Sequence, residues 1–248
     1  MFTKEEQQKL TELMNSNEDF AFFINKCNKE CKLFTSQFSH ELRNPLTLIK
    51  STVQLIESAH PEAKDFKYWN QLTEDINGLE NLLTELSMYN NGEVVTKQKQ
   101  NFLLLLKSVL STFRPLAEQN GIELSLTITE DEIPYYIEYS LDPIKMKQVF
   151  TNLIRNAFEA TTNGNHINIE CRVAPESYLT IVVQNDGKMI PSDEISTIFN
   201  PYVTYKPGGT GLGLAISSRI IAAHNGTINA TSTEDKTSFT IQLPLHVD

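Results

Sequence analysis

Cysteine is scarce in this chain of 248 residues, which has three, and no two of them have the spacing of a CxxC motif. This suggests neither a disulfide framework nor a zinc site. Basic residues are also few, 21 against 31 acidic residues, and the resulting net charge of −10 argues against a nucleic-acid partner, which requires a basic surface. No stretch approaches the run of about 18 apolar residues that a membrane span needs, and the polar start MFTKEEQQKL is not a signal peptide. We therefore expect a chain without a membrane span that is located in the cytoplasm.

The stretch 34–57 carries the most informative residues of the N-terminal half. Its apolar side chains recur at spacings of three, four and seven residues, which form one stripe on an α-helix. They are Phe34, Phe38, Leu42, Ile49, Val53 and Ile56. His40 lies off this stripe and is expected to point to water, with Glu41 beside it and Asn44 one turn further on. Pro45 removes one backbone donor, which predicts a bend just after the histidine.

A heptad-like apolar pattern leads into this stretch from the N-terminal side. It consists of Phe20, Ile24, Cys27, Cys31, Phe34 and Phe38. Two cysteines at positions i and i+4 could form a redox or metal pair, or they could be two small buried apolar side chains. The second interpretation is favoured.

A second helix is predicted from about residue 63 to 89, after a break at residues 58–61, where Pro61 cannot continue the first one. Its apolar residues follow an uninterrupted heptad: Trp69, Leu72, Ile76, Leu79, Leu83 and Leu86. Two helices with one apolar stripe each cannot bury both stripes well alone, whereas two such hairpins from two chains form a four-helix bundle. We therefore expect residues 1–91 to form a helical domain that makes a homodimer.

The segment 92–101 is expected to be a linker, with a short strand at Val94 and Val95. From residue 102 to 248 the pattern changes to that of an α/β domain. Helices are predicted at 102–119, 142–162 and near 210–223, and strands at 122–128, 135–139, 166–173, 178–184, 227–232 and 237–243. Asp142-Pro143 has the signature of a helix start, and Asn163-Gly164 that of the same helix's end. Together these elements predict a mixed sheet covered by helices on one face.

Two features of this second domain suggest a nucleotide site. On the 142–162 helix one face is continuously polar, with three asparagines, which are mediocre helix formers and so suggest a task. This face comprises Gln148, Asn152, Asn156, Glu159 and Asn163. The run 208–214, GGTGLGL, opens a predicted helix, where glycines allow close backbone approach to phosphate and the helix start supplies N–H donors. It is not a Walker P-loop, because no GK[ST] follows.

Several strings together resemble one family. The string HELRNPL at 40–46 resembles the phosphoacceptor box of the sensor histidine kinases, in which ATP phosphorylates a histidine on a helix. The string NLIRNAFEA at 152–160 resembles their N-box, and GTGLGL at 209–214 their second glycine box. Residues 185–191 align with the adenine-binding DxGxGIP box. Residues 198–202 resemble the F-box, and 224–226 match a third, weaker glycine box. The segment from about 188 to 209 is the expected mobile lid over ATP.

The resemblance implies a role for individual residues. His40 would accept the phosphoryl group, and Glu41 would be the base for the imidazole proton. Asn44 would orient water for hydrolysis of the phosphoaspartate on the response regulator, the protein to which the family passes the phosphoryl group. Asn156 would coordinate Mg²⁺. The residues implied in ATP binding are Asn152, Arg155, Asn185, Gly187, Lys206, Gly209, Thr210, Gly211, Leu212 and Gly213.

The chain departs from the family at two positions of the adenine box. Asn185 replaces an aspartate that accepts the adenine amino group, and an uncharged oxygen should accept more weakly. Met189 replaces a glycine and places a side chain where backbone normally approaches the base.

The expected fold is therefore α+β, a helical hairpin that forms a dimeric four-helix bundle followed by an α/β sandwich that binds ATP. The expected function is that of a protein-histidine kinase, which uses ATP and Mg²⁺ and passes the phosphoryl group to a response regulator whose dephosphorylation it also promotes. One alternative is a catalytically weakened phosphotransferase or scaffold of the same fold. Another is an ATP-driven clamp ATPase, which would share the nucleotide boxes but would not need the His40 box.

Overall fold

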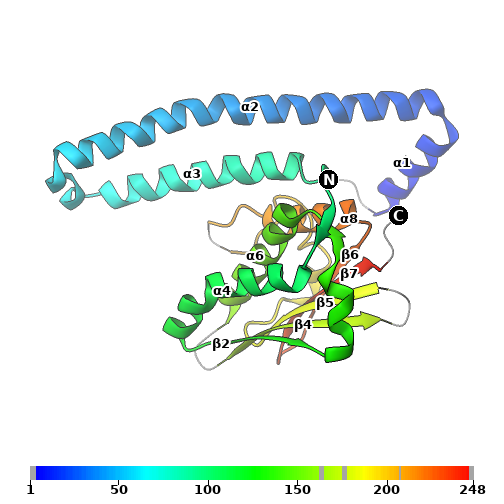
Figure 1. Cartoon of the computed structure of the whole chain (residues 1–248). Coiled ribbons are helices and arrows are strands. Elements are labelled where there is room, and N and C mark those ends of the chain that lie inside the picture. Colours follow the sequence, from blue (N-terminus) through cyan, green and yellow to red (C-terminus); the bar gives the residue numbers. More distant parts are fainter. Residues whose placement is uncertain (1–3, 162–164, 175–177, 207, 246–248) are drawn as a thin grey trace. The chain divides into compact units, whose positions relative to one another are not determined.

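Two units make up the chain, Met1–Asn90 and Asn91–Asp248. The computed structural model describes residues 4–161, 165–174, 178–206 and 208–245 (Figure 1). The first unit is helical, and its elements are α1 (Lys4–Ser16), α2 (Glu18–Ala59), the 3₁₀ helix η1 (Pro61–Asp65) and α3 (Trp69–Asn90). Asn17 separates α1 from α2 and caps α2, because its side-chain oxygen accepts a hydrogen bond from the backbone N–H of Phe20 at 2.9 Å.

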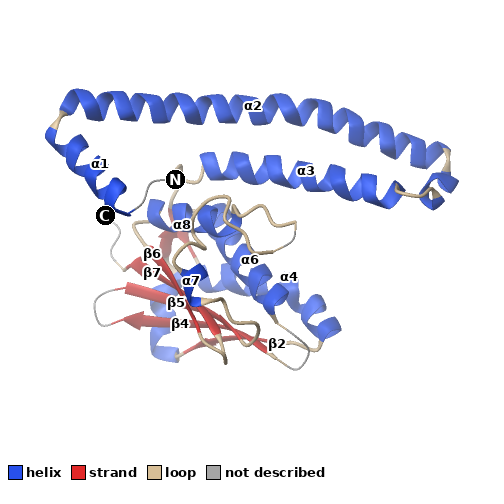
Figure 2. Ribbon diagram, turned by 180° about the vertical axis from the view of Figure 1, so that it is seen from behind, coloured by secondary structure: helices blue, strands red, loops and turns tan. Residues whose placement is uncertain are grey.

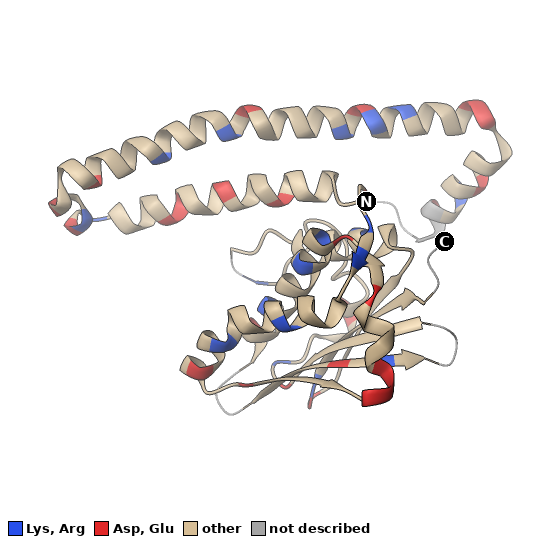
Figure 3. Cartoon of the chain, viewed as in Figure 1, with Lys and Arg blue, Asp and Glu red and all other residues tan. Residues whose placement is uncertain are grey.

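The two long helices of the first unit, α2 and α3, lie side by side and antiparallel (Figure 1). The predicted break is confirmed at His60-Pro61, whereas Pro45 does not interrupt α2, which continues through it as one gently curved helix. Every charged residue of α3 is acidic (Figure 3), and one of them, Glu80, forms a salt bridge to Lys50 of α2. The hairpin is therefore held by charge as well as by apolar packing.

The core of the hairpin is small. It consists of Leu46, Val53, Ile76 and Leu83, with Trp69 packed against it. The Trp69 indole N–H donates to Glu57 Oε1 at 2.8 Å near the turn between the helices. The predicted stripe on α2 is thus only partly right: of its members, Val53 alone is buried within the chain. The others are exposed: Phe34, Phe38, Leu42, Ile49 and Ile56.

The favoured interpretation of the two helix cysteines is wrong for the single chain. Cys27 and Cys31 are both exposed on α2 rather than buried. They precede Leu46, the first α2 residue of the hairpin core, and no described helix buries them.

The second unit contains a five-stranded sheet in the order β2-β4-β5-β7-β6. The β2–β4 pair is parallel and the other pairs are antiparallel, so the sheet is mixed, as predicted. The strands are β2 (Glu123–Ile128), β4 (His166–Ala174), β5 (Tyr178–Asn185), β6 (Thr227–Ser232) and β7 (Thr237–Pro244). Burial alternates along β5 and β7, because successive side chains of a strand point to opposite faces.

Three helices cover one face of this sheet, which confirms the predicted layers (Figure 2). They are α4 (Phe102–Asn120), α6 (Pro143–Ala160) and α8 (Gly213–Ala223). Shorter elements are η2 (Glu130–Glu132), α5 (Ile133–Ile137) and α7 (Ser192–Ile195). Gly121 ends α4 in the left-handed conformation, with φ of 61°, as glycine at a helix end commonly does. The core includes Phe102, whose ring centroid is 5.7 Å from that of Phe150.

Two predicted strands are wrong. Residues 135–137 lie in α5 instead, because Pro134 starts a helix and the buried Tyr136 hydroxyl donates to the backbone oxygens of Arg172 and Thr180. Of the predicted stretch, only Tyr139 lies in a strand. Val94 and Val95 are not in a strand. The strand of this region is β1 (Gln98–Gln100), which pairs antiparallel with β3 (Tyr139–Leu141).

The end of α6 differs slightly from the prediction. The helix stops at Ala160, and Thr161 follows in an extended conformation. The predicted stop signal Asn163-Gly164 lies outside the described residues.

Candidate active site

His40 lies on α2 and is exposed, as the sequence pattern predicts. Its neighbour Ser39 is fully buried, and the Ser39 hydroxyl donates to the Thr35 carbonyl oxygen at 2.7 Å. Buried residues recur every seven positions along α2, at Ser39, Leu46 and Val53, so this line faces the hairpin partner and turns His40 outward. Glu41 and Asn44 are exposed as well. The three predicted residues of the first unit therefore share an open helix surface.

The predicted residues of the second unit gather at the facing parts of α6 and α8. The Asn152 amide donates to the hydroxyl of Ser217 at 3.0 Å, so the two helices are joined by a polar contact. At Gly213, the first residue of α8, an added Cβ would lie 2.4 Å from Asn152 Oδ1. The asparagine side chain thus fills the space that only glycine leaves free.

A lysine from the segment before α8 reaches back to α6. The Lys206 ammonium donates to Asn156 Oδ1 at 3.3 Å and forms an ion pair with Glu159. The amide oxygen of Asn156 is therefore already directed at a cation. Arg155, between these residues in sequence, is exposed.

The glycine run that precedes α8 folds tightly on the segment 202–204. Gly211 has φ of 69°, and an added Cβ would lie 2.6 Å from the backbone nitrogen of Val203. An added Cβ at Gly209 would lie 2.5 Å from Thr204 Oγ1. The Thr210 hydroxyl oxygen accepts from the backbone N–H of Leu212 at 3.3 Å. This turn positions the start of α8, whose first N–H groups have no partner within the helix.

Leu212 differs from the other predicted residues of this run. Its side chain is fully buried in the core, so only its backbone is available to a ligand.

The adenine-box residues lie at the end of β5 and directly after it. Asn185 is 2% exposed, and its amide donates to the Asp186 carbonyl oxygen at 3.4 Å. Gly187 packs against the end of α6, where an added Cβ would lie 2.2 Å from the carbonyl oxygen of Ala160. Met189, the second departure from the family pattern, is 41% exposed.

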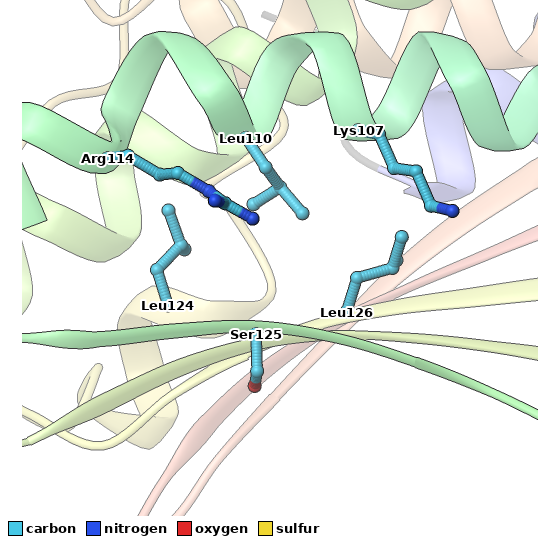
Figure 4. A pocket seen from close by; sticks show the side chains of 6 residues that line it. All are labelled: Lys107, Leu110, Arg114, Leu124, Ser125 and Leu126. Atoms are coloured by element: carbon cyan, nitrogen blue, oxygen red, sulfur yellow. The ribbon is translucent and has the colours of Figure 1, made fainter.

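A hollow of about 510 Å³ lies elsewhere in the second unit, between α4 and β2 (Figure 4). It is lined by Lys107, Leu110, Arg114, Leu124, Ser125 and Leu126. Figure 4 shows that the Ser125 side chain points away from α4, and its hydroxyl donates to Asn168. None of the predicted nucleotide residues lines this hollow, so it is separate from the candidate site.

Comparison with known proteins identifies both units. The family described as His Kinase A (phospho-acceptor) domain matches residues 32–93. The family described as Histidine kinase-, DNA gyrase B-, and HSP90-like ATPase matches residues 141–247. The catalytic domain of the histidine kinase ThkA is 30% identical, with a TM-score of 0.54, and the match covers 60% of this chain and 95% of that domain. This chain belongs to the sensor histidine kinases.

Further relatives extend the match across both units of this histidine kinase. Sporulation kinase E of Bacillus subtilis is 28% identical over 84% of this chain, but the chain spans only 28% of that protein's length. The structure of ThkA in complex with the response regulator protein TrrA matches 93% of this chain and 67% of that one, with 26% identity and a TM-score of 0.63. In the described ranges of the histidine kinase, no helix combines the length and apolar character that a membrane crossing requires.

Sequence reasoning on this histidine kinase missed two contacts between α6 and α8, one at the site and one at the other ends of these helices. Ser217 lies one turn after Gly213 on α8, and this spacing was the only available signal that it could meet Asn152. The backbone N–H of Asp142 donates to Nε2 of His224 at 2.9 Å. This pairing had no local signal in the sequence, because 82 residues separate the two.

Proposed function

We propose that this histidine kinase transfers the γ-phosphoryl group of ATP to His40 and passes it on to an aspartate of a response regulator. The observation that carries the proposal is the exposure of His40 on a long helix of a chain whose second unit holds the N-box and glycine-box residues against each other. Because α2 is held by α3, the nucleophile is presented on a defined surface.

The residues of the second unit fit MgATP. Gly211 and Gly213 let the chain before α8 pack closely on Val203 and Asn152, because an added Cβ at either glycine would meet these residues. This packing fixes the helix start, whose N–H groups would bind phosphate oxygens. Asn156 offers an amide oxygen, a suitable ligand for a hard cation such as Mg²⁺, and this oxygen already accepts from the Lys206 ammonium. Bound Mg²⁺ would neutralise charge on the phosphates.

Phosphoryl transfer needs little covalent participation by the protein. A lone pair on a ring nitrogen of His40 attacks the γ-phosphorus, the bond to the oxygen that bridges the β and γ phosphates breaks, and ADP leaves. The other ring nitrogen then loses its proton, and Glu41 is the base proposed to accept it. Transfer to a regulator aspartate breaks the new N–P bond and forms an acyl phosphate.

The proposed assembly is a homodimer. The exposed apolar side chains Phe34, Phe38 and Ile49 of α2 support it, because a second hairpin would cover them in a four-helix bundle. We assign residues 1–91 to dimerisation and phosphoacceptance, 92–101 to a linker and 102–248 to ATP binding. We also propose a cytoplasmic location, where both ATP and a response regulator are accessible.

The proposed partner is a response regulator. The complex of the related ThkA with TrrA supports this choice. Leu48 and Leu55 give further support, since they are 70% and 69% exposed and lie roughly on the His40 side of α2 by helix geometry. A regulator that docks there would bring its aspartate to the histidine.

The test is phosphorylation of the purified chain by γ-labelled ATP with Mg²⁺. The label should be acid-labile and base-stable, as a phosphohistidine is. His40→Gln should abolish it and leave ATP affinity within about threefold, because nucleophile and nucleotide residues belong to different units. His60→Gln is the matched control, because His60 is also an exposed histidine of the first unit and should label normally.

Label that persists in His40→Gln would contradict the assignment. If the wild type binds ATP but stays unlabelled, while His40 accepts phosphate from a phosphorylated regulator, the chain is instead a phosphotransferase of the same fold. Weak adenine binding at Asn185 and Met189 would then be the first cause to examine.

A further inference from the structure

The segment that follows α3, residues 91–96, begins the second unit and is fixed to the rest of it by hydrogen bonds. The backbone N–H of Thr96 donates to Asp142 Oδ2 at 2.8 Å. The Lys145 ammonium donates to the carbonyl oxygen of Asn91 at 3.0 Å. Asp142 and Lys145 both belong to the start of α6. We call residues 91–96 the exit segment.

The same segment is also joined to α8. Glu93 forms an ion pair with Arg219, which lies in the middle of α8. The exit segment is therefore held by both helices that carry the nucleotide residues, rather than by one of them.

Asp142 serves α6 and the exit segment at once. Its Oδ1 accepts from the backbone N–H groups of Ile144 and Lys145 at 3.1 and 3.0 Å, which caps α6, while Oδ2 is used by Thr96. Asp142 is 7% exposed, and burial alone would raise the pKa of its carboxyl. The three backbone N–H donors outweigh this effect, so the pKa of Asp142 lies below its usual value.

His224, which ends α8, completes the contact from behind. Its Nε2 accepts from the backbone N–H of Asp142 at 2.9 Å, and its Nδ1 lies 2.7 Å from the Ile220 carbonyl oxygen. Since Nε2 must accept, the ring is neutral with its proton on Nδ1. The ring is 1% exposed, and burial lowers the pKa of His224, which favours this neutral form.

These contacts lie at the opposite ends of α6 and α8 from parts of the nucleotide site. On α8, Gly213 is the first residue and His224 follows the last. On α6, Asn156 is 14 positions after Asp142, which is about 21 Å along a helix. A packed helix moves as a stiff body, so a shift at one end is carried to the other.

We propose that Asp142 and His224 are positioning residues that couple nucleotide occupancy between α6 and α8 to the exit segment, and through it to α3 of the phosphoacceptor unit. We call the contact among Thr96, Asp142 and His224 the exit latch. The inference rests on the proposed kinase function for its consequence, the rate of His40 phosphorylation. The coupling itself is a property of the chain that can be measured without that reaction.

Two variants open the latch by independent routes. Asp142→Asn keeps a capping oxygen for α6 but has one acceptor fewer, so it cannot serve both α6 and Thr96. Thr96→Pro removes the N–H donor and leaves both helices untouched. Val95→Pro is the matched control, since it stiffens the same segment and keeps the Thr96 amide.

The first readout is amide hydrogen exchange of residues 91–100, with and without a non-hydrolysable ATP analogue and Mg²⁺. In the wild type the analogue should change exchange in the exit segment by at least about threefold. In Asp142→Asn the Thr96 amide should exchange at least about tenfold faster, and the response to the analogue should disappear. Thr96→Pro should lose the response as well, whereas Val95→Pro should keep it.

The second readout is the kinetics of His40 phosphorylation. Both latch variants should change the rate at saturating ATP by about fivefold or more and leave the KM for ATP within about twofold. The rate is expressed per molecule that binds the ATP analogue, because a loss of folded protein would lower the apparent rate without changing KM. The inference would be overturned if the Thr96 amide exchanged at the wild-type rate in Asp142→Asn. It would also be overturned if that amide exchanged faster while the His40 phosphorylation rate and the response to the analogue stayed unchanged. A wild type that never labels would refute the kinase proposal alone, because the exchange experiment still decides the coupling.

Discussion

The two units of the chain differ in how completely they bury their own apolar residues. The largest fully buried side chains, such as Phe102, Tyr136 and Phe150, all belong to the second unit. In the first unit the hairpin core contains four residues, while Phe34, Phe38 and Ile49 are 68%, 48% and 50% exposed. The α/β unit therefore has a core that one chain closes, whereas the helical unit leaves large apolar side chains exposed, which the proposed second hairpin would cover.

This difference matches what each unit is proposed to do. The nucleotide site depends on close contacts, such as Gly213 against Asn152, that only a well-packed region can hold. The phosphoacceptor histidine must instead be reached by other molecules, and an exposed helix surface permits this. Substitutions in the two units should accordingly fail in different ways.

The largest effect is expected on dimerisation, at the exposed apolar stripe of α2 that the proposed second hairpin would cover. Ile49→Glu should weaken dimerisation by at least about a hundredfold, because a carboxylate would be buried without a partner in the bundle. Analytical ultracentrifugation over a range of protein concentrations measures this.

The adjacent residue provides the control. Leu48→Glu introduces the same charge at a 70% exposed position and should leave the dimer intact, while slowing transfer to a regulator. Equal dimer affinity in Ile49→Glu and the wild type would mean that the exposed stripe has another use.

The next effect belongs to the closed unit. Gly211→Ala should weaken ATP binding by about thirtyfold, because its φ of 69° is strained for alanine and the new Cβ would meet the backbone of Val203. Isothermal titration with ATP and Mg²⁺ measures the loss.

Gly78→Ala is the comparison in the open unit, since an added Cβ there has nothing within 4 Å. It should leave ATP binding unchanged and slightly stabilise α3. If both alanine variants bound ATP normally, the glycine turn before α8 would not be part of the nucleotide site.

Much of the fold could be predicted because its signals are local. The alternation of β5 and β7, the N-cap at Asp142 and the glycine at the end of α4 each lie within a few residues of the element they define. The strand predicted at 135–139 was wrong because its structure depends on contacts that are distant in the sequence. Residues 135–139 have strong strand propensity, yet 135–137 form a helix, because Tyr136 donates to backbone oxygens 36 and 44 residues away.

The same limit applied to the site. The asparagine face of α6 and the glycine run before α8 were visible as patterns, and their resemblance to a family supplied the roles. The partner of each group was not visible. Ser217 meets Asn152 across 65 residues, and Glu93 meets Arg219 across 126, so only the packed structure brings them together.

A smaller effect tests the chemistry of the open helix surface. Asn44→Ala should leave His40 autophosphorylation nearly intact and slow dephosphorylation of the cognate regulator by about tenfold, because the exposed amide is proposed to hold the attacking water. Release of phosphate from the phosphorylated regulator measures this. If both activities fell together with dimer stability, Asn44 would serve the helix next to Pro45 rather than the reaction.

The smallest effect should separate the two units by their response to pH. His224 binds its proton less readily when folded than when unfolded, so the second unit should be fully stable above about pH 6.5 and lose stability as pH falls, by at most about 1.4 kcal/mol per pH unit. Urea unfolding followed by circular dichroism at pH 7.5 and 5.5 measures this, and His224→Gln should reduce the dependence.

The single tryptophan of the chain, Trp69, gives an internal control because it reports on the helical unit. Its fluorescence transition should be less sensitive to pH over the same range. A pH effect confined to the tryptophan signal would place the sensitive group in the first unit instead.

Pro45 gives α2 an uneven stiffness. A proline has no N–H, so the carbonyl oxygen of Glu41 lacks the donor that residue 45 would otherwise provide, although the helix continues. That oxygen lies one residue after His40, and α2 has one hydrogen bond fewer to resist bending there. The part of α2 that carries the histidine can therefore tilt against the part that packs on α3 at lower cost than at any neighbouring turn. A mechanical signal travelling along α2 would be converted into motion directly beside His40, the proposed phosphoacceptor.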